Sequence, residues 1–208
     1  MSAPVPDGDG TGLSRYIAVR PAVITALGID PGGTSGLFLG SWWPGERKPG
    51  LWRAWQCDMA GTPDLLGWIL ESYREISVAG IEAFDARERS RKMRGFSASR
   101  MHVLIGELEA VLDAARVPHV TYPPATVKGW ATDKRLTAAG ITEATAGMAD
   151  HARDAGRACL FAACKHAGLR DPLSRIRTAS PLDPGAVTTR NGEDERRLRD
   201  HARITGPG

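Results

Sequence analysis

The chain has 208 residues, of which 42% are hydrophobic and 25% are charged, and its formal net charge is +3. These values are typical of one globular domain with tails. Apolar stretches such as Pro21–Ile29 are far shorter than the roughly 20 residues that span a bilayer, which excludes a membrane-spanning protein. The small positive charge does not by itself indicate nucleic-acid binding, because the position of the charges matters more.

Cysteine usage and the N-terminal sequence bear on the cellular compartment. Cys57, Cys159 and Cys164 are odd in number and form no CxxC pair. We expect reduced thiols rather than a disulfide framework or a zinc site. The N-terminus lacks the charged start and apolar core of a secretory signal, so we expect a cytoplasmic location, in the host cytoplasm if the source is viral.

The composition changes twice along the chain. Residues 1–20 are rich in Gly, Pro and Asp and show no periodicity, which is typical of a flexible arm. Residues 21–168 carry the regular apolar patterns and form one predicted domain. Residues 169–208 mix Pro, Arg, Thr and acidic residues, and we expect a largely disordered tail there.

Five apolar runs predict five strands. The first three are separated by short turns, which favours an antiparallel meander. The last two alternate with helical patterns, which is typical of parallel strands. The predicted strands are Val23–Ile29, Gly36–Trp43, Leu51–Cys57, Val78–Phe84 and His119–Tyr122. We therefore predict the α/β class, with a five-stranded mixed sheet (three antiparallel strands, then two parallel) and helices on both faces.

Four helices are expected between and after these strands. The first begins with Thr62 as a hydroxyl N-cap, followed by proline and an acid, and runs to about Tyr73. Ser97 is the expected cap of a long amphipathic helix that ends near Ala115. Its apolar residues at helical spacing are Val103, Leu104, Leu108, Val111 and Leu112. The last two helices are predicted at residues 133–139 and 149–166.

Isolated acidic residues lie at or near the ends of two predicted strands. Asp30 closes the first strand, and Glu82 lies inside the apolar fourth strand. A carboxylate in a buried strand is costly unless it is paired or bound to a cation. For Glu82, an arginine partner or a position on an edge strand would also explain the pattern.

The last predicted helix carries a third group of candidate ligands. Asp150, His151 and Asp154 are spaced three and four apart and are expected to share a face. That face continues through small and apolar residues suited to packing on a sheet. For Asp150, a favourable interaction with the helix macrodipole is an equally good explanation.

Together these residues favour one chemistry. Sites rich in carboxylates prefer hard cations such as Mg²⁺ or Mn²⁺. Two such ions about 3.5–4 Å apart can activate a water molecule and stabilise the leaving oxygen of a phosphate ester. His151 would serve either as a ligand or as a proton carrier. The predicted catalytic and metal-binding residues are Asp30, Glu82, His151 and Asp154.

A cluster of basic residues follows Glu82 and precedes the long helix. A basic loop that leads away from a metal site is well placed to hold DNA phosphates. A solvated loop with acidic neighbours is the alternative. The basic residues predicted to contact DNA are Arg87, Arg89, Arg91, Lys92 and Arg94.

Five segments in this order resemble the motifs of the RuvC group of Holliday-junction resolvases. The first strand and its turn read LGIDPGGTSG at residues 27–36, and the fourth strand reads AGIEAF at residues 79–84. Residues 123–128 read PPATVK and are similar to the family's PxxVK segment. Residues 132–134 resemble its ADK helix start, and residues 151–155 resemble its (D/H)xxDA ending.

The resemblance implies a ribonuclease-H-like fold and a Mg²⁺-dependent endonuclease with two ions per site, in which Mn²⁺ can substitute. It also implies a homodimer, formed on the long helix, that makes paired nicks in branched DNA such as a four-way junction. Asp30, Glu82, His151 and Asp154 match the family's four metal-site positions. Residues at matching DNA-proximal positions are Lys128, Lys134 and Phe84, the last of which could equally be a core residue.

Some features depart from the family pattern and leave other functions open. The segment between the VK and ADK motifs is cut to residues 129–131, which is typical of divergent, phage-like members. A flap, fork or general branched-DNA nuclease is therefore an alternative. An ATP-binding phosphotransferase of the actin-like or sugar-kinase type is disfavoured because the chain is too short for two such domains. A catalytically inactive DNA-binding scaffold is disfavoured by the complete ligand set.

Overall fold

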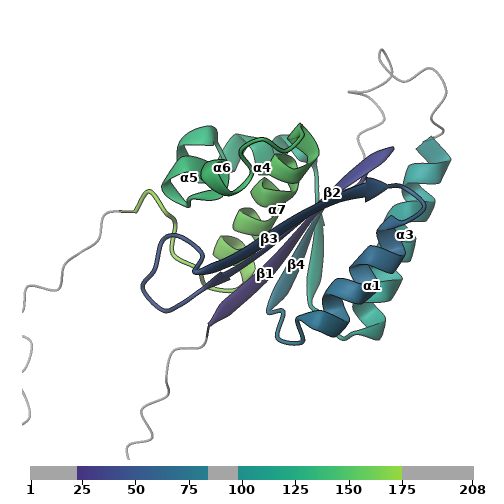
Figure 1. Ribbon diagram of the computed structural model, residues 1–208, viewed down its shortest axis with the longest axis horizontal. Coiled ribbons are helices and arrows are strands. Elements are labelled where there is room, and N and C mark those ends of the chain that lie inside the picture. The colour runs from purple at the N-terminus through teal and green to yellow at the C-terminus, as the bar shows by residue number, and fades with distance from the viewer. Residues whose placement is uncertain (1–22, 84–97, 175–208) are drawn as a thin grey trace, which may run out of the picture. The chain divides into compact units, whose positions relative to one another are not determined.

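A computed structural model describes residues 23–83 and 98–174 (Figure 1). The expected N-terminal arm and most of the expected tail lie outside the described residues. The chain divides into two units, Met1–Pro172 and Leu173–Gly208, and only the first two residues of the second unit are described. The elements in chain order are β1 Ile24–Asp30, β2 Thr34–Trp42, β3 Leu51–Asp58, α1 Thr62–Ser72, β4 Val78–Glu82, α3 Ala98–Ala114, β5 His119–Tyr122, α4 Pro124–Trp130, α5 Asp133–Ala138, α6 Ile141–Ala144 and α7 Asp150–His166.

The strands form one sheet in the order β3-β2-β1-β4-β5. Strands β1, β2 and β3 pair antiparallel through short turns, whereas β4 pairs parallel with both β1 and β5. The predicted mixed sheet is confirmed. The parallel pairing has a functional consequence, because β1 and β4 end side by side at the same edge of the sheet.

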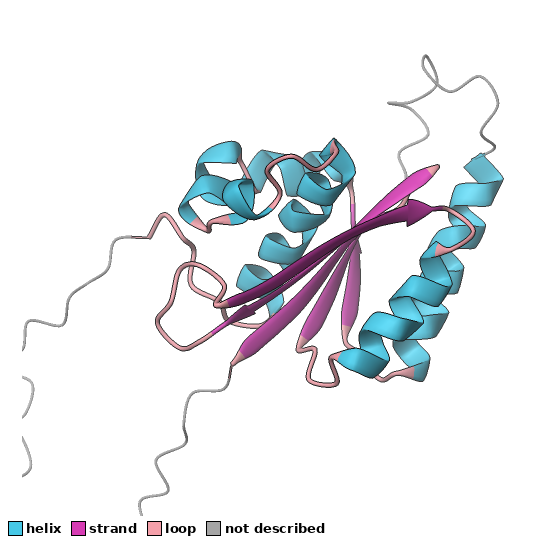
Figure 2. Cartoon of the chain, in the orientation of Figure 1, coloured by secondary structure: helices cyan, strands magenta, loops and turns pink. Residues whose placement is uncertain are grey.

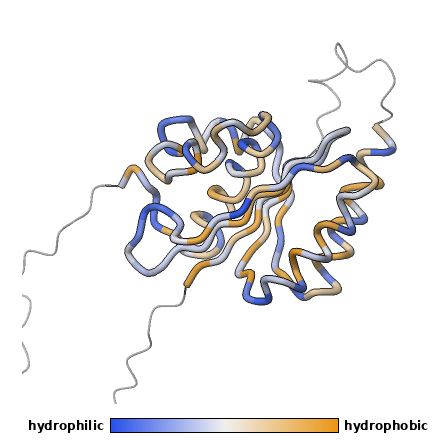
Figure 3. The backbone as a smooth tube through the Cα atoms, in the orientation of Figure 1, coloured by the Kyte–Doolittle hydropathy of each residue, from blue (hydrophilic) through white to orange (hydrophobic). Residues whose placement is uncertain are grey.

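Helices cover both faces of the sheet (Figure 2). Helices α1 and α3 lie on one face, and α4 to α7 lie on the other (Figure 1). Side chains of a strand point alternately to the two faces, so Leu27 and Ile29 join the core beneath α1 and α3, whereas Ala26 joins the core beneath α7. Hydrophobic residues accordingly run along the central strands (Figure 3).

Helix α7 lies unusually close to the backbone of the sheet. A Cβ atom added at Gly28 of β1 would collide with the carbonyl oxygen of Ala155, and one added at Gly36 of β2 would collide with the carbonyl of His151. On β4, Gly80 approaches the backbone of Ala158 in the same way. Three neighbouring strands therefore present glycine to one helix, which fixes where the N-terminal turn of that helix lies.

Several local expectations are wrong. Thr62 is not the N-cap of α1, because Gly61 caps the helix; the Thr62 hydroxyl instead lies 2.8 Å from the carbonyl oxygen of Asp58. Val103 does not pack inward and is 60% exposed. Helices α4 and α6 were not predicted, because they are short and have no apolar periodicity long enough to detect. Ser97 lies outside the described residues.

The remaining sequence expectations concern thiols and membranes. Cys57, Cys159 and Cys164 are all free thiols, and Cys159 is fully buried against β1. In the described part of the chain, no helix has both the length and the hydropathy needed to span a membrane.

The contact between α7 and the sheet predicts a sharp difference between two Gly→Ala substitutions. Gly28→Ala places a methyl group against helix backbone that cannot move aside, so we expect the free energy of unfolding to fall by about 3 kcal/mol or more. Gly106→Ala in α3 meets no atom within 4 Å, so we expect a gain of up to about 1 kcal/mol from helix propensity. Urea denaturation of both variants measures the difference. Equal stabilities would show that the close packing is not a constraint.

Candidate functional site

Two buried carboxylates leave the sheet side by side. Asp30 is the last residue of β1 and Glu82 is the last residue of β4, and each is only 2% exposed. The parallel register pairs Ile29 with Ile81, so the two acids occupy the next position on neighbouring strands. Strand alternation directs both toward the face covered by α7.

The turn after Asp30 is held by a buried hydroxyl. The backbone N–H of Gly32 donates to Ser35 Oγ at 3.2 Å, and the hydroxyl of Thr62 lies 2.9 Å from the same oxygen. This arrangement ties the β1–β2 turn to the start of α1. The turn that follows Asp30 is therefore held both by its own hydrogen bond and by the contact with α1.

Helix α7 brings His151 to the first of these acids. His151 Nδ1 lies 2.9 Å from Asp30 Oδ2, although the residues are 121 positions apart in the chain. Asp150 is turned away: its side chain is 87% exposed and accepts a hydrogen bond from Arg153. The expectation that Asp150 shares the face of His151 and Asp154 is therefore wrong, because the first turn of α7 carries it into solvent.

Lys128 of α4 links the other two carboxylates. Its Nζ lies 3.4 Å from Glu82 Oε1 and 3.2 Å from Asp154 Oδ2. The lysine was expected only near DNA, yet its ammonium group lies between two of the predicted metal ligands. The four predicted ligands thus fall into two neighbouring pairs, Asp30 with His151, and Glu82 with Asp154 bridged by Lys128.

The electrostatics of this group are set first by burial and then by neighbouring negative charge. Burial raises the pKa of Glu82 to about 7; the charges of Asp30 and Asp154 add to the rise, and Lys128 opposes it. Burial acts to lower the pKa of Lys128, but Glu82 and Asp154 outweigh it and hold that pKa above its ordinary value. The charged form of Glu82 is therefore disfavoured both by burial and by the neighbouring carboxylates.

Arg157, which the sequence analysis did not single out, binds the Asp154 carboxylate. Arg157 Nε donates to Asp154 Oδ1 at 3.1 Å, and its Nη1 donates to the carbonyl oxygen of Ala131 at 2.9 Å. Its Nη2 donates to Asp133 Oδ1. The spacing of Asp154 and Arg157, one helical turn apart, was the only signal in the sequence.

The donor set suits a hard cation. Among the described residues, no three histidine, cysteine, aspartate or glutamate side chains are gathered closely enough to enclose a metal ion. Glu82 Oε2, however, is buried without a hydrogen-bond partner, and a cationic ammonium group lies against Glu82 Oε1. A buried, unsatisfied carboxylate oxygen in a cluster of acids is the kind of ligand that Mg²⁺ and Mn²⁺ take.

The other predicted DNA-contacting residues are placed only in part. Lys134, on α5, is exposed. The others, Phe84, Arg87, Arg89, Arg91, Lys92 and Arg94, lie outside the described residues, and their roles stay predictions.

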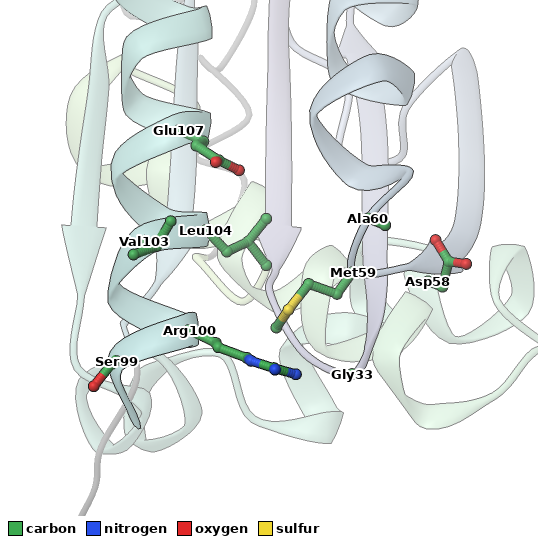
Figure 4. A pocket seen from close by; sticks show the side chains of 9 residues that line it. All are labelled: Gly33, Asp58, Met59, Ala60, Ser99, Arg100, Val103, Leu104 and Glu107. Atoms are coloured by element: carbon green, nitrogen blue, oxygen red, sulfur yellow. The ribbon is translucent and has the colours of Figure 1, made fainter. Parts of the chain in front are cut away.

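A separate hollow of about 600 Å³ lies on the opposite face of the sheet, between the loop that joins β3 to α1 and the N-terminal half of α3. Met59 and Leu104 line it, and Arg100 reaches across it toward the loop that carries Gly33 (Figure 4). Asp58 and Glu107 also line it, so its charges are mixed. The hollow belongs to the α1–α3 face, not to the acidic cluster under α7.

Comparison with known proteins bears on this geometry. No family model and no curated protein matches the sequence. Among solved structures, Thermus thermophilus RuvC matches with a TM-score of 0.51 and 16% identity, over 65% of this chain and 91% of that chain. The same protein in complex with a Holliday junction substrate matches with a TM-score of 0.53 and 21% identity, over 72% and 99% of the two chains.

The chain has the ribonuclease-H-like fold. A ROK family protein from Streptococcus pneumoniae also matches, with a TM-score of 0.33 and 20% identity over 52% of this chain and 37% of that chain, which is too distant to carry an argument.

The raised pKa of Glu82 predicts a pH-dependent gain in stability on neutralising this residue. With a folded pKa near 7 and an ordinary value of 4.5, the folded state binds the extra proton, so wild-type stability falls as pH rises through this window. In the presence of EDTA, we expect Glu82→Gln to raise the free energy of unfolding by about 2 kcal/mol at pH 8 and by little at pH 4.5.

Chemical denaturation at both pH values measures this effect. Glu71→Gln on α1 is the matched control, because Glu71 is exposed and its neutralisation should change little. A loss of stability at pH 8 in Glu82→Gln would contradict the proposed cost of holding a charged Glu82 in this buried site.

Proposed function

We propose that the chain is a divalent-metal-dependent endonuclease of the RuvC type, which resolves four-way DNA junctions by paired nicks as a homodimer. One observation carries the proposal: at one edge of a ribonuclease-H-like sheet, Asp30 contacts His151 of α7, and Lys128 bridges Glu82 to Asp154 of α7. The likeness to a RuvC protein bound to a Holliday junction substrate supports this substrate class.

Asp30, Glu82, Asp154 and His151 would hold the cation. Bound Mg²⁺ or Mn²⁺, with two ions per site, supplies an activated water and charge stabilisation at the scissile phosphate. The deeply buried Glu82 and Asp30 form the floor of the site, because strand ends hold them rigidly. Asp154 is more exposed, at 23% of its side chain, and closes the site from the helix.

Two further side chains have roles that follow from their positions. The side chain of Lys128 is 43% exposed, and its ammonium group contacts the carboxylates of Glu82 and Asp154. It is therefore placed to contact a phosphate when a cation takes over the carboxylates. The imidazole of His151, paired with Asp30 and also partly exposed, is placed to hold or pass a proton at Nδ1.

The proposal predicts that Asp30→Asn abolishes cleavage without abolishing DNA binding. The amide removes a charged ligand and lowers repulsion toward phosphate, so we expect cleavage to fall at least about 1000-fold while the Kd for a junction stays equal or decreases. Cleavage is measured on a four-way junction, a flap, a fork and a linear duplex, with Mg²⁺ and with chelator.

The controls separate activity from substrate choice. Asp64→Asn, at an exposed position on α1, should cleave as the wild type does. Full activity of Asp30→Asn would reject the metal site. Preference for the flap or fork would retain the nuclease and replace the junction as its substrate.

The homodimer is proposed on α3, the long helix at which the family resemblance locates the subunit contact. Val103 lies on its outer surface and is 60% exposed, and Trp68 of α1 is 52% exposed on the same layer. Large apolar side chains in these positions are typical of surfaces that a partner covers. A second copy of α3 would bury Val103 by two-fold symmetry.

A charge at Val103 should therefore separate the subunits. We expect Val103→Glu to shift the wild-type dimer to a monomer, because two carboxylates would face each other across the symmetry axis. Val103→Ile keeps the apolar surface and should remain dimeric. Sedimentation velocity measures both. A monomeric wild type, or a dimeric Val103→Glu, would remove α3 from the proposed contact.

A further inference from the structure

We propose that Arg157 is a positioning residue, which fixes the orientation of the Asp154 carboxylate and thereby sets the affinity of the site for a divalent cation. The inference rests on the proposed metal-dependent function and assigns a new role within that site. Arg157 lies one turn after Asp154 on α7, and its side chain is only 11% exposed.

The two oxygens of Asp154 have different partners. Oδ1 accepts a hydrogen bond from Arg157 Nε at 3.1 Å, whereas Oδ2 lies 3.2 Å from Lys128 Nζ. The guanidinium group therefore occupies Oδ1 and leaves Oδ2 on the side of Lys128. Lys128 also contacts Glu82. A carboxylate held on one side has one oxygen left to offer to a cation.

The rest of the guanidinium group is anchored outside α7. Nη1 donates to the carbonyl oxygen of Ala131, and Nη2 donates to Asp133 Oδ1. Ala131 directly follows α4, the helix that carries Lys128, and Asp133 is the first residue of α5. Arg157 thus joins the two elements that bring Lys128 and Asp154 to the site, and it holds them in a single arrangement.

Only arginine can make these contacts together. Its planar guanidinium presents five N–H donors in a fixed fork, whereas lysine has one flexible ammonium group. Lysine at position 157 would keep the positive charge but lose the simultaneous contacts with Asp154, Asp133 and Ala131. Positioning and charge can therefore be separated by substitution.

The two roles predict opposite results for Mn²⁺ binding. If Arg157 acts by position, both Arg157→Lys and Arg157→Met should weaken the binding of Mn²⁺ alone, by about 10- to 100-fold. If it acts only by charge, Arg157→Lys should bind as the wild type does, and Arg157→Met should bind more tightly, because a repelling cation is gone. Electron paramagnetic resonance of free Mn²⁺ measures Kd without DNA or turnover.

Arg135 offers a matched control. It likewise donates to a carboxylate, Asp171, and to a backbone carbonyl, that of Trp130, at 2.8 Å. It is also largely buried, but it touches none of the predicted ligands in these contacts. Arg135→Lys and Arg135→Met should lower the melting temperature as the Arg157 variants do and leave the Kd for Mn²⁺ unchanged.

A milder variant keeps the test valid if the Arg157 variants do not fold. Asp133 is 77% exposed and contributes one anchor to Arg157, so Asp133→Ala should weaken Mn²⁺ binding by a few fold and be compensated at high Mn²⁺ concentration. Cleavage by Arg157→Lys should recover in the same way, with little change in the KM for DNA.

The outcomes distinguish the two proposals. Wild-type protein that binds no Mn²⁺ would reject the proposed function and this role with it. Wild-type protein that binds Mn²⁺, with unchanged affinity in Arg157→Lys or in Asp133→Ala, would overturn the positioning role alone. Equal weakening in the Arg135 variants would also overturn it, because loss of stability would then explain the effect.

Discussion

Helix α7 rests directly on the backbone of β1, β2 and β4, and this contact determines the geometry of the acidic cluster. Glycines at Gly28, Gly36 and Gly80 remove the side chains that would otherwise hold the helix at an ordinary distance. The helix therefore delivers His151 and Asp154 to the strand ends that carry the acids. A helix on longer side chains would lie farther from the sheet, beyond the reach of a short aspartate.

The close contact also creates an electrostatic cost. Burial raises the pKa of Glu82, the charges of Asp30 and Asp154 add to the rise, and one oxygen of Glu82 is buried without a hydrogen-bond partner. A charged Glu82 in this position lowers the stability of the fold, as is common for residues of ligand-binding sites. Two basic side chains offset part of this negative charge. Lys128 contacts Oδ2 of Asp154, and Arg157 contacts Oδ1 of the same residue.

Much of the fold followed from local patterns. Short turns predicted the antiparallel meander, because its strands follow one another directly in the chain. Strand–helix alternation predicted the parallel pairing, because parallel strands need a long crossover that is usually helical. Asp30 at the end of a strand and Glu82 within an apolar run were also readable, since an acid in such a run stands out; that β4 ends at Glu82 came from the structure. Short helices such as α4 and α6 escaped detection because a single turn or two has no period to recognise.

The sequence by itself therefore determined the sheet, its order of elements and the four candidate ligands. Only the tertiary structure decided how the ligands pair, that Lys128 reaches two of them, that Asp150 faces solvent and that Arg157 holds Asp154. The physical reason is distance along the chain. Periodicity reports which face a residue occupies, but the contact between two long side chains depends on how separate elements pack.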